Sequence, residues 1–149
     1  MAPLAEREWL EVWRLFLEVH ARVVGRLEME MESEQGIPLP WFDVLIQLSF
    51  APDGQLRMHD LLRNLMLTRS GLTRRIDRME VAGLVERRSC SDDARGVVVA
   101  LTPLGRAKLA DAAPHHLARV HKHFARHLTP QELRAVRSAF KRVLAALDP

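Results

Sequence analysis

The sequence is poor in cysteine and in aromatic residues. It contains 149 residues with 1 Cys, no Tyr and 5% aromatic residues in total. A single cysteine, Cys90, excludes an internal disulfide and is typical of a protein in a reducing compartment. The scarcity of large rings predicts a helical interior filled mainly by Leu, Val and Ala.

Other features are also absent. No leader peptide and no long apolar run is visible, so we expect a cytoplasmic protein without a membrane contact. Gly-rich phosphate loops, GxSxG elbows, HExxH motifs and Cys–His pairs are missing, so we expect neither an enzyme nor a cofactor. Hydrophobic residues at 48% and charged residues at 28% are typical of a globular protein, and the length predicts one domain.

A helix with two contrasting faces is predicted between Thr68 and Gly83. Thr68 is a suitable N-cap, and Gly83 supplies a C-terminal stop. At about 100° per residue, one face carries apolar residues that would seat on a core. These are Leu72, Ile76 and Met79. The opposite face and its flanks carry Ser70, Thr73, Arg74, Asp77, Arg78 and Val81.

Such a helix suits the major groove of DNA. Arginine can pair bidentately with guanine there, and Ser or Thr can reach bases or phosphates. An ordinary solvated basic face is the alternative, and the helix alone does not decide between the two.

A β-hairpin is predicted directly after this helix. Residues 85–89 and 97–101 are β-prone and of matching length, with a polar turn between them. Arg87 and Arg88 lead into the turn and Arg95 lies near its tip, where an arginine can enter a narrow minor groove. Asp93 could hold Arg95 by a bidentate pair. A plain solvated turn charge is the alternative for Arg95.

The residues from Gln55 to Arg106 resemble the winged helix-turn-helix of the MarR family of transcriptional regulators. The motifs that carry the resemblance are Ser70-Gly71-Leu72-Thr73-Arg74, Ile76-Asp77-Arg78-Met79-Glu80, Gly83-Leu84-Val85-Glu86-Arg87, Asp93-x-Arg95-Gly96 and Leu101-Thr102-x-x-Gly105. The flanking helices also fit the family, so the resemblance spans nearly the whole chain.

The resemblance implies a mainly α (α+β) fold with about six helices and a small antiparallel β-wing. Residues 1–149 would form a single domain, with dimerisation helices in 1–35 and 103–149 and the DNA-binding lobe in 55–102. The expected function is a homodimeric, ligand-responsive repressor that binds a pseudo-palindromic double-stranded operator. The expected DNA contacts are Arg69, Ser70, Thr73, Arg74, Arg78, Arg87, Arg88, Asp93 and Arg95.

The remaining helices follow from periodicity and breakers. We expect a first helix from Leu4 to about Ser33, a second from about Trp41 to Phe50, and a third over 58–65. Residues 55–57 could add a third strand to the wing. Thr102-Pro103 should start a long helix that Pro114 kinks or splits.

A last helix is expected after Thr129-Pro130-Gln131-Glu132, which form a capping box. Its apolar residues recur at three and four: Leu133, Val136, Phe140, Val143 and Leu147. This stripe favours packing on a partner chain. Burial within the same chain is the alternative.

An effector pocket is implied by the resemblance, because members of the family often bind aromatic acids or phenols between the dimer helices and the DNA-binding lobe. Candidate lining residues are Trp9, Trp13, His20, Trp41 and Asp43. Trp41-Phe42-Asp43-Val44-Leu45 resembles a motif of urate-responsive members, which also use a tryptophan on an extra N-terminal helix that this chain lacks. Core packing and helix capping are the alternatives for these residues.

Metal and redox sensing are the remaining alternatives. His123 and His127 are four apart on a predicted helix and could share a metal, but no cysteine or carboxylate cluster joins them, so we expect no metal site. Cys90 lies near Arg87 and Arg88, which would favour a thiolate, yet a bystander thiol is the preferred interpretation. A winged-helix dimer that binds only protein is the alternative from another class.

Overall fold

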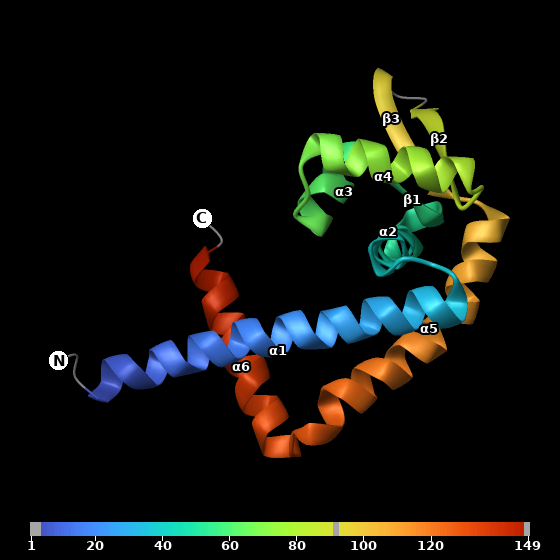
Figure 1. Ribbon diagram of the computed structural model, residues 1–149. Helices are drawn as coiled ribbons and strands as arrows, with labels where there is room; N and C mark the ends of the chain where they lie inside the picture. The colour runs from blue at the N-terminus through green and yellow to red at the C-terminus, as the bar shows by residue number, and fades with distance from the viewer. Residues whose placement is uncertain (1–3, 91–92, 148–149) are drawn as a thin grey trace. The chain divides into compact units, whose positions relative to one another are not determined.

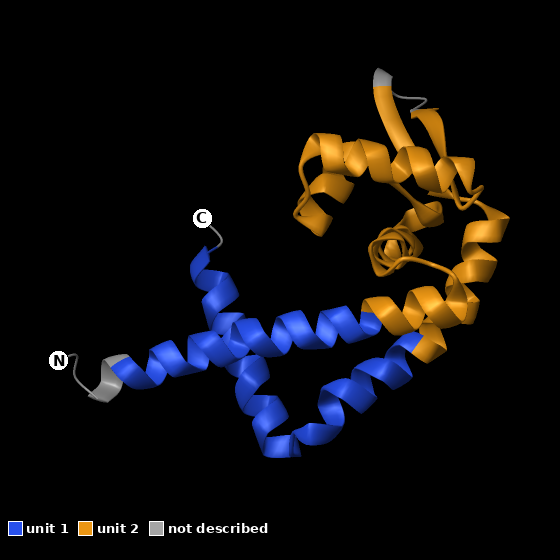
Figure 2. Cartoon of the chain, viewed as in Figure 1, with its two compact units in different colours: residues 1–27, 116–149 blue, residues 28–115 orange. Residues whose placement is uncertain are grey.

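The structure, a computed structural model, describes residues 4–90 and 93–147, and the side chains of residues 7–89 and 96–147. The chain divides into two compact units. Unit 1 comprises residues 1–27 and 116–149, and unit 2 comprises residues 28–115 (Figure 2).

Unit 2 contains most of the elements of the fold (Figure 1). It begins with the end of α1 (Leu4–Gln35) and ends with the start of α5 (Pro103–His123). Between them lie α2 (Leu39–Phe50), the 3-10 turn η1 (Pro52–Gly54), β1 (Gln55–Arg57), α3 (Met58–Leu65), α4 (Arg69–Val81), β2 (Val85–Cys90) and β3 (Asp93–Leu101).

The three strands form one antiparallel sheet in the order β1-β3-β2. Leu56 of β1 and Arg87 of β2 both pair with Val99 of the central strand. The predicted third strand is confirmed. The hairpin is longer than predicted, because pairing of β2 with β3 extends to Cys90 and Asp93 across an irregularity after Ser89. Residues in a projecting hairpin can pair through their backbone groups alone, without alternating apolar and polar side chains. The sequence pattern therefore gave no sign of this extension.

Helices α2, α3 and α4 share one apolar core with the sheet. Leu45 of α2, Leu61 of α3 and Ile76 of α4 are fully buried, and Val99 of β3 is buried with them. Each such side chain contributes roughly 1.5–3 kcal/mol by leaving water. The predicted apolar face of α4 is therefore confirmed, since Leu72 and Met79 are also 0% exposed.

A threonine and a glycine fix the start of α5 against the end of α4. Thr102 Oγ1 donates to the carbonyl oxygen of Gly83 at 2.6 Å and accepts from the amide of Gly105 at 2.9 Å. A Cβ atom on Gly105 would lie 2.0 Å from the carbonyl oxygen of Leu84. The helix therefore approaches the backbone too closely for any side chain at this position, which gives the Leu101-Thr102-x-x-Gly105 motif a physical reason.

Unit 1 consists of the first part of α1, the second part of α5, the 3-10 turn η2 (Ala125–His127) and α6 (Pro130–Leu147). The capping box is confirmed, because Glu132 accepts from the amide of Thr129 at 2.7 Å and Thr129 Oγ1 accepts from the amide of Glu132 at 3.3 Å. Pro114 does not split α5, which continues to His123. A proline removes one helical hydrogen bond, and the residues on either side retain their own.

The apolar residues of unit 1 are largely exposed within the chain. Phe16 of α1 contacts Phe140 of α6 edge to face, with ring centroids 5.6 Å apart. Nevertheless Trp13 is 54% and Leu147 72% exposed, and α6 contains no buried residue. No helix in the described part of the chain is long and apolar enough to cross a membrane.

Candidate nucleic-acid interface

Helix α4 is the second helix of a helix-turn-helix. The turn before it places Met66 in the left-handed region, with φ 53°. Thr68 then caps α4, since its Oγ1 accepts from the amide of Gly71 at 3.2 Å. At the other end Gly83 takes φ 75°, and its amide donates to the carbonyl of Glu80 at 2.9 Å. Both predicted ends of the helix are confirmed.

The outward face of α4 carries arginines over its whole length. Arg69, Arg74 and Arg78 are exposed together with Ser70, whereas the opposite face is buried in the core. This arrangement places guanidinium groups and the positive N-terminal end of a rigid helix toward solvent. It is the arrangement that a helix requires to enter the major groove.

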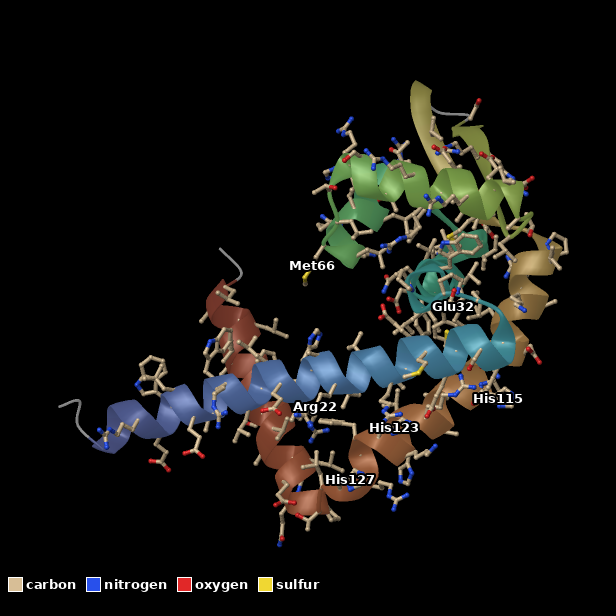
Figure 3. The ribbon with its side chains drawn as sticks, viewed as in Figure 1. Arg22, Glu32, Met66, His115, His123 and His127 are labelled. Atoms are coloured by element: carbon tan, nitrogen blue, oxygen red, sulfur yellow. The ribbon has the colours of Figure 1, made fainter. Side chains whose placement is uncertain are left out.

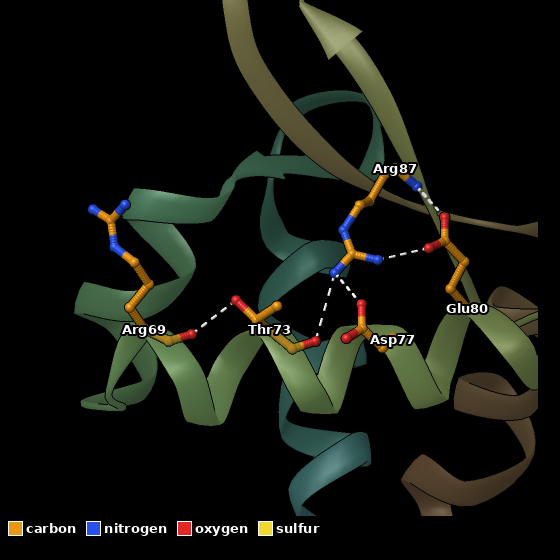
Figure 4. A network of polar contacts seen from close by, with 5 residues as sticks. All are labelled: Arg69, Thr73, Asp77, Glu80 and Arg87. Atoms are coloured by element: carbon orange, nitrogen blue, oxygen red, sulfur yellow. Dashed lines mark hydrogen bonds and ion pairs between the residues drawn. The ribbon is translucent and has the colours of Figure 1, made fainter.

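Thr73 uses its hydroxyl group within the helix. It is half-buried, and its hydroxyl donates to the carbonyl oxygen of Arg69 at 2.9 Å (Figure 4). The hydroxyl hydrogen is thus engaged within the helix. Thr73 can offer lone pairs to a base amino group and its methyl group to a thymine, but in this arrangement it has no hydrogen for a phosphate.

Arg87 of β2 reaches across to α4. Its Nη2 atom lies 2.6 Å from Oδ1 of Asp77, and its Nη1 atom lies 2.6 Å from Oε2 of Glu80 (Figure 4). The hydrogen bonds from the backbone and side chain of Arg87 lower the pKa of Glu80. Partial burial opposes the charge on Arg87, but the bonds to Asp77 and Glu80 raise its pKa. Both groups are therefore held in their charged forms.

Arg88 has a different environment. Its Nε atom donates to Oε1 of Glu86 at 2.7 Å, and its Nη2 atom pairs with the same oxygen. Its side chain is 54% exposed, against 28% for Arg87. Successive side chains of a strand point to opposite faces, so the two neighbouring arginines do not act as one basic pair.

Asp93 and Arg95 belong to β3, but their side chains lie outside the described residues, as does that of Cys90. The pairing of Asp93 with Arg95 and the contact of Arg95 with a minor groove therefore stay predictions.

Two open cavities flank the N-terminal half of α4. One, of about 390 Å³, is lined by Arg57, Met58, His59, Leu62, Arg69, Thr73, Gly96 and Val97. The other, of about 440 Å³, is lined by Pro38, Pro40, Trp41, Gly71, Arg74, Arg75 and Arg78. The sequence did not single out Arg57, His59 or Arg75 as site residues. Arg75 lies beside the apolar face of the helix and is half-buried, and its Nη1 atom donates to the carbonyl of Pro40 at 3.3 Å.

The candidate effector residues fall into different units. Trp9, Trp13 and His20 belong to unit 1, and Trp41 and Asp43 belong to unit 2. Partial desolvation raises the pKa of Asp43, an effect that Arg75 opposes and Glu28 reinforces. A common pocket for these five residues stays a prediction.

The predicted helical pair of histidines is wrong. His123 is the last residue of α5, whereas His127 belongs to η2 (Figure 3). Phe124 leaves the helical region with φ −132° and ψ −69°, so the two side chains do not share a helix face. In the part of the chain that the structure describes, no group of three or more His, Cys, Asp or Glu residues is placed to hold a metal ion.

The fold and the outward arginines of α4 define a winged helix-turn-helix protein. A model of the MarR family matches residues 35–96. Comparison with curated protein sequences gives no significant match.

Solved structures match over nearly the whole chain. AbsC, a MarR family transcriptional regulator from Streptomyces coelicolor, is 33% identical, with a TM-score of 0.89 over 99% of this chain and 97% of AbsC. Sco3205 from the same organism, solved in complex with DNA, is 29% identical, with a TM-score of 0.90 over 100% of this chain and 92% of Sco3205. A cysteine-substituted MarR from E. coli, complexed with operator DNA, is 29% identical, with a TM-score of 0.81 over 96% and 99% of the two chains.

The chain therefore belongs to the MarR family, whose members are DNA-binding transcription regulators and not enzymes.

Proposed function

We propose that the protein is a homodimeric, sequence-specific repressor that a small aromatic or phenolic ligand releases from its operator. The observation that carries the proposal is the outward face of α4, where Arg69, Arg74 and Arg78 are exposed above a fully buried apolar face. Two similar proteins have been solved with DNA, which supports the same partner for this chain.

The mechanism follows from the geometry of this class of protein. Two copies of α4 would enter successive major grooves about one helical turn apart. The wings would reach the flanking minor grooves, where the potential is most negative. Phosphate contacts would supply much of the affinity, and base contacts by Arg74 would supply sequence preference.

The dimer proposal rests on unit 1. Residues 1–35 and 103–149 would carry the interface, and their exposed apolar side chains include Trp9, Val12, Val143 and Leu147. Apolar faces of this extent seldom remain in water. The exposed arginines of α4 belong to the DNA-binding lobe of residues 55–102 and would lie outside this interface.

The ligand proposal requires a difference in affinity between two states. A ligand releases the protein from DNA only if it binds more tightly to an arrangement of the dimer that cannot bind DNA than to the arrangement that can. Trp9, Trp13, His20, Trp41 and Asp43 are the proposed lining residues. Metal or redox control and a purely protein-binding role are the alternatives that DNA and ligand titrations would separate.

Arg74→Ala provides the test of DNA reading. The wild-type chain is used to select a duplex from a random-sequence library, and affinities are then measured for single-base variants of that duplex. Arg74→Ala should cost about 1–3 kcal/mol and relax preference at one base position. Arg22→Ala is the matched control, because Arg22 is a 79% exposed arginine outside the DNA-binding lobe, paired with Glu18. Sedimentation checks that this variant keeps the oligomeric state of the wild-type chain.

Two results would count against this assignment. An equal loss on every sequence would make Arg74 a phosphate contact. Failure of the wild-type chain to enrich any duplex would overturn the repressor and favour a protein-binding role.

A further inference from the structure

Arg87 joins the wing to the recognition helix through its backbone and its side chain. Its amide donates to Oε1 of Glu80 at 2.9 Å, and its Nη1 atom donates to Oε2 of the same carboxylate at 2.6 Å. Its Nη2 atom donates to Asp77 at 2.6 Å and lies 3.5 Å from the carbonyl oxygen of Thr73. One residue of β2 therefore contacts three residues of α4 (Figure 4).

This set of bonds leaves Arg87 poorly placed for a phosphate. The guanidinium directs both terminal nitrogens at α4, and the side chain is 28% exposed. Charge-assisted bonds of 2.6 Å are among the strong polar contacts of a protein, so releasing Arg87 toward DNA would cost more than an ordinary surface rearrangement.

The two carboxylates are partly exposed on the helix that carries Arg74 and Arg78. Asp77 is 56% and Glu80 38% exposed, and Asp77 lies one helical turn from Arg74 on α4. Unpaired carboxylates at this distance from a DNA-reading arginine would repel phosphates and attract Arg74 or Arg78 away from the bases. Arg87 offsets part of this charge and donates hydrogen bonds to both oxygens of Glu80 and to Oδ1 of Asp77.

We propose that Arg87 is a positioning residue, which fixes β2 against α4 and shields Asp77 and Glu80 from DNA, and that it does not itself contact DNA. The inference rests on the proposed function, since it assigns how the wing and the recognition helix are held for reading. It separates Arg87 from Arg88, whose partner Glu86 lies on the same strand.

The test compares four variants on the duplex that the wild-type chain selects from a random library. Arg87→Gln should bind about tenfold more weakly, because two carboxylates become uncompensated. The triple variant Arg87→Gln/Asp77→Asn/Glu80→Gln should recover to within about threefold of wild type, because no charge is left to shield. Arg87→Lys keeps the charge but lacks the planar fork whose two terminal nitrogens reach Glu80 and Asp77 separately, so it should also bind more weakly than wild type. Arg22→Gln, outside the DNA-binding lobe, is the control for loss of an exposed arginine, provided that sedimentation shows the same oligomeric state as for the wild-type chain.

The salt dependence supplies a readout that separates positioning from direct contact. A phosphate contact that is removed lowers the slope of log affinity against log salt by about 1. We expect the triple variant to retain the wild-type slope.

The proposal would be overturned by a triple variant that stays as weak as Arg87→Gln with a reduced slope, or by Arg87→Lys binding as tightly as wild type. Unchanged binding by Arg87→Gln would overturn it as well. Thermal unfolding of each variant identifies loss of folding, and the lysine variant keeps the test valid if the glutamine variant does not fold. Failure of the wild-type chain to select DNA would instead contradict the proposed function.

Discussion

The two units of the chain differ in how they treat apolar side chains. In the described residues, every buried apolar side chain except Leu27 lies in residues 28–115. Large exposed ones, by contrast, gather in unit 1, where Trp9 is 58% and Val143 58% exposed. Unit 2 closes its core with its own chain, whereas unit 1 leaves most of its large apolar side chains exposed.

Helices α4 and α6 show the difference most directly. Both carry apolar residues at intervals of three and four. In α4 these residues are 0% exposed, whereas in α6 Leu133 is 38% and Leu147 72% exposed. A row of apolar residues at intervals of three and four therefore identifies the face of a helix that favours burial. Only the three-dimensional structure shows whether the same chain buries that face.

The largest effect is expected from charges on the exposed stripe. Val143→Glu with Leu147→Glu should raise the dimer dissociation constant about a thousandfold, which corresponds to about 4 kcal/mol of lost apolar burial. Sedimentation equilibrium measures this constant. Val81→Glu, at a 91% exposed position of unit 2, is the control and should remain dimeric. A stable dimer in the double variant would show that the stripe is not the interface.

The next largest effect is expected at Gly105, where α5 approaches the backbone of Leu84. Gly105→Ala would place Cβ 2.0 Å from the carbonyl oxygen of Leu84, so α5 must shift, at a cost of about 3 kcal/mol. Gly25→Ala in α1 is the matched control. It meets nothing within 4 Å and should leave stability equal or higher. Urea unfolding compares the two, and equal losses would contradict the difference between the units.

A smaller difference is expected between two threonine caps. Thr102→Ala removes a half-buried hydroxyl that bonds Gly83 and Gly105, and should cost about 2 kcal/mol. Thr129→Ala removes an exposed cap of α6 and should cost about 1 kcal/mol. Thermal unfolding measures both. A larger loss at Thr129 would mean that unit 1 is the more tightly ordered part.

The smallest effect is a pH dependence at Glu80. Its pKa is lower in the folded chain than the usual 4.5, so its stabilising contribution is present above that value and is lost as the pH falls through the lowered pKa. The carboxylate is 38% exposed, which limits the contribution to less than about 1 kcal/mol. The free energy of unfolding should fall less steeply with decreasing pH in Glu80→Gln than in wild type, in the range below pH 4.5. If the variant lost stability as steeply as wild type, the pH dependence would come from other carboxylates.

Local signals in the sequence predicted much of the DNA-binding lobe. The Thr68 cap, the Gly83 stop and the buried face of α4 each depend on residues close together in the chain, and all three are confirmed. The bridge from Arg87 to Asp77 and Glu80 was not predicted. It joins residues seven and ten positions apart on two different elements, and a count of basic residues gives no sign that one of them is already paired.

Two differences between prediction and structure have a related cause. The expected helical pairing of His123 with His127 assumed that α5 continues, but the chain leaves the helix at Phe124 without a glycine or proline to mark the point. Conversely, Pro114 was expected to kink or split its helix, and the split does not occur, since α5 continues to His123. Breaker residues indicate local preference, and the contacts of the whole helix decide whether it ends there.

The central claim is that two copies of the DNA-binding lobe in unit 2 are joined through the exposed apolar helices of unit 1. Selection of DNA from a random-sequence library by the wild-type chain tests this claim most directly. The expected product is an inverted repeat whose half-sites have centres about one helical turn apart, with flanks rich in A·T pairs where the wings lie. Enrichment of a single half-site without symmetry, or of no sequence at all, would contradict a dimer that reads DNA with α4.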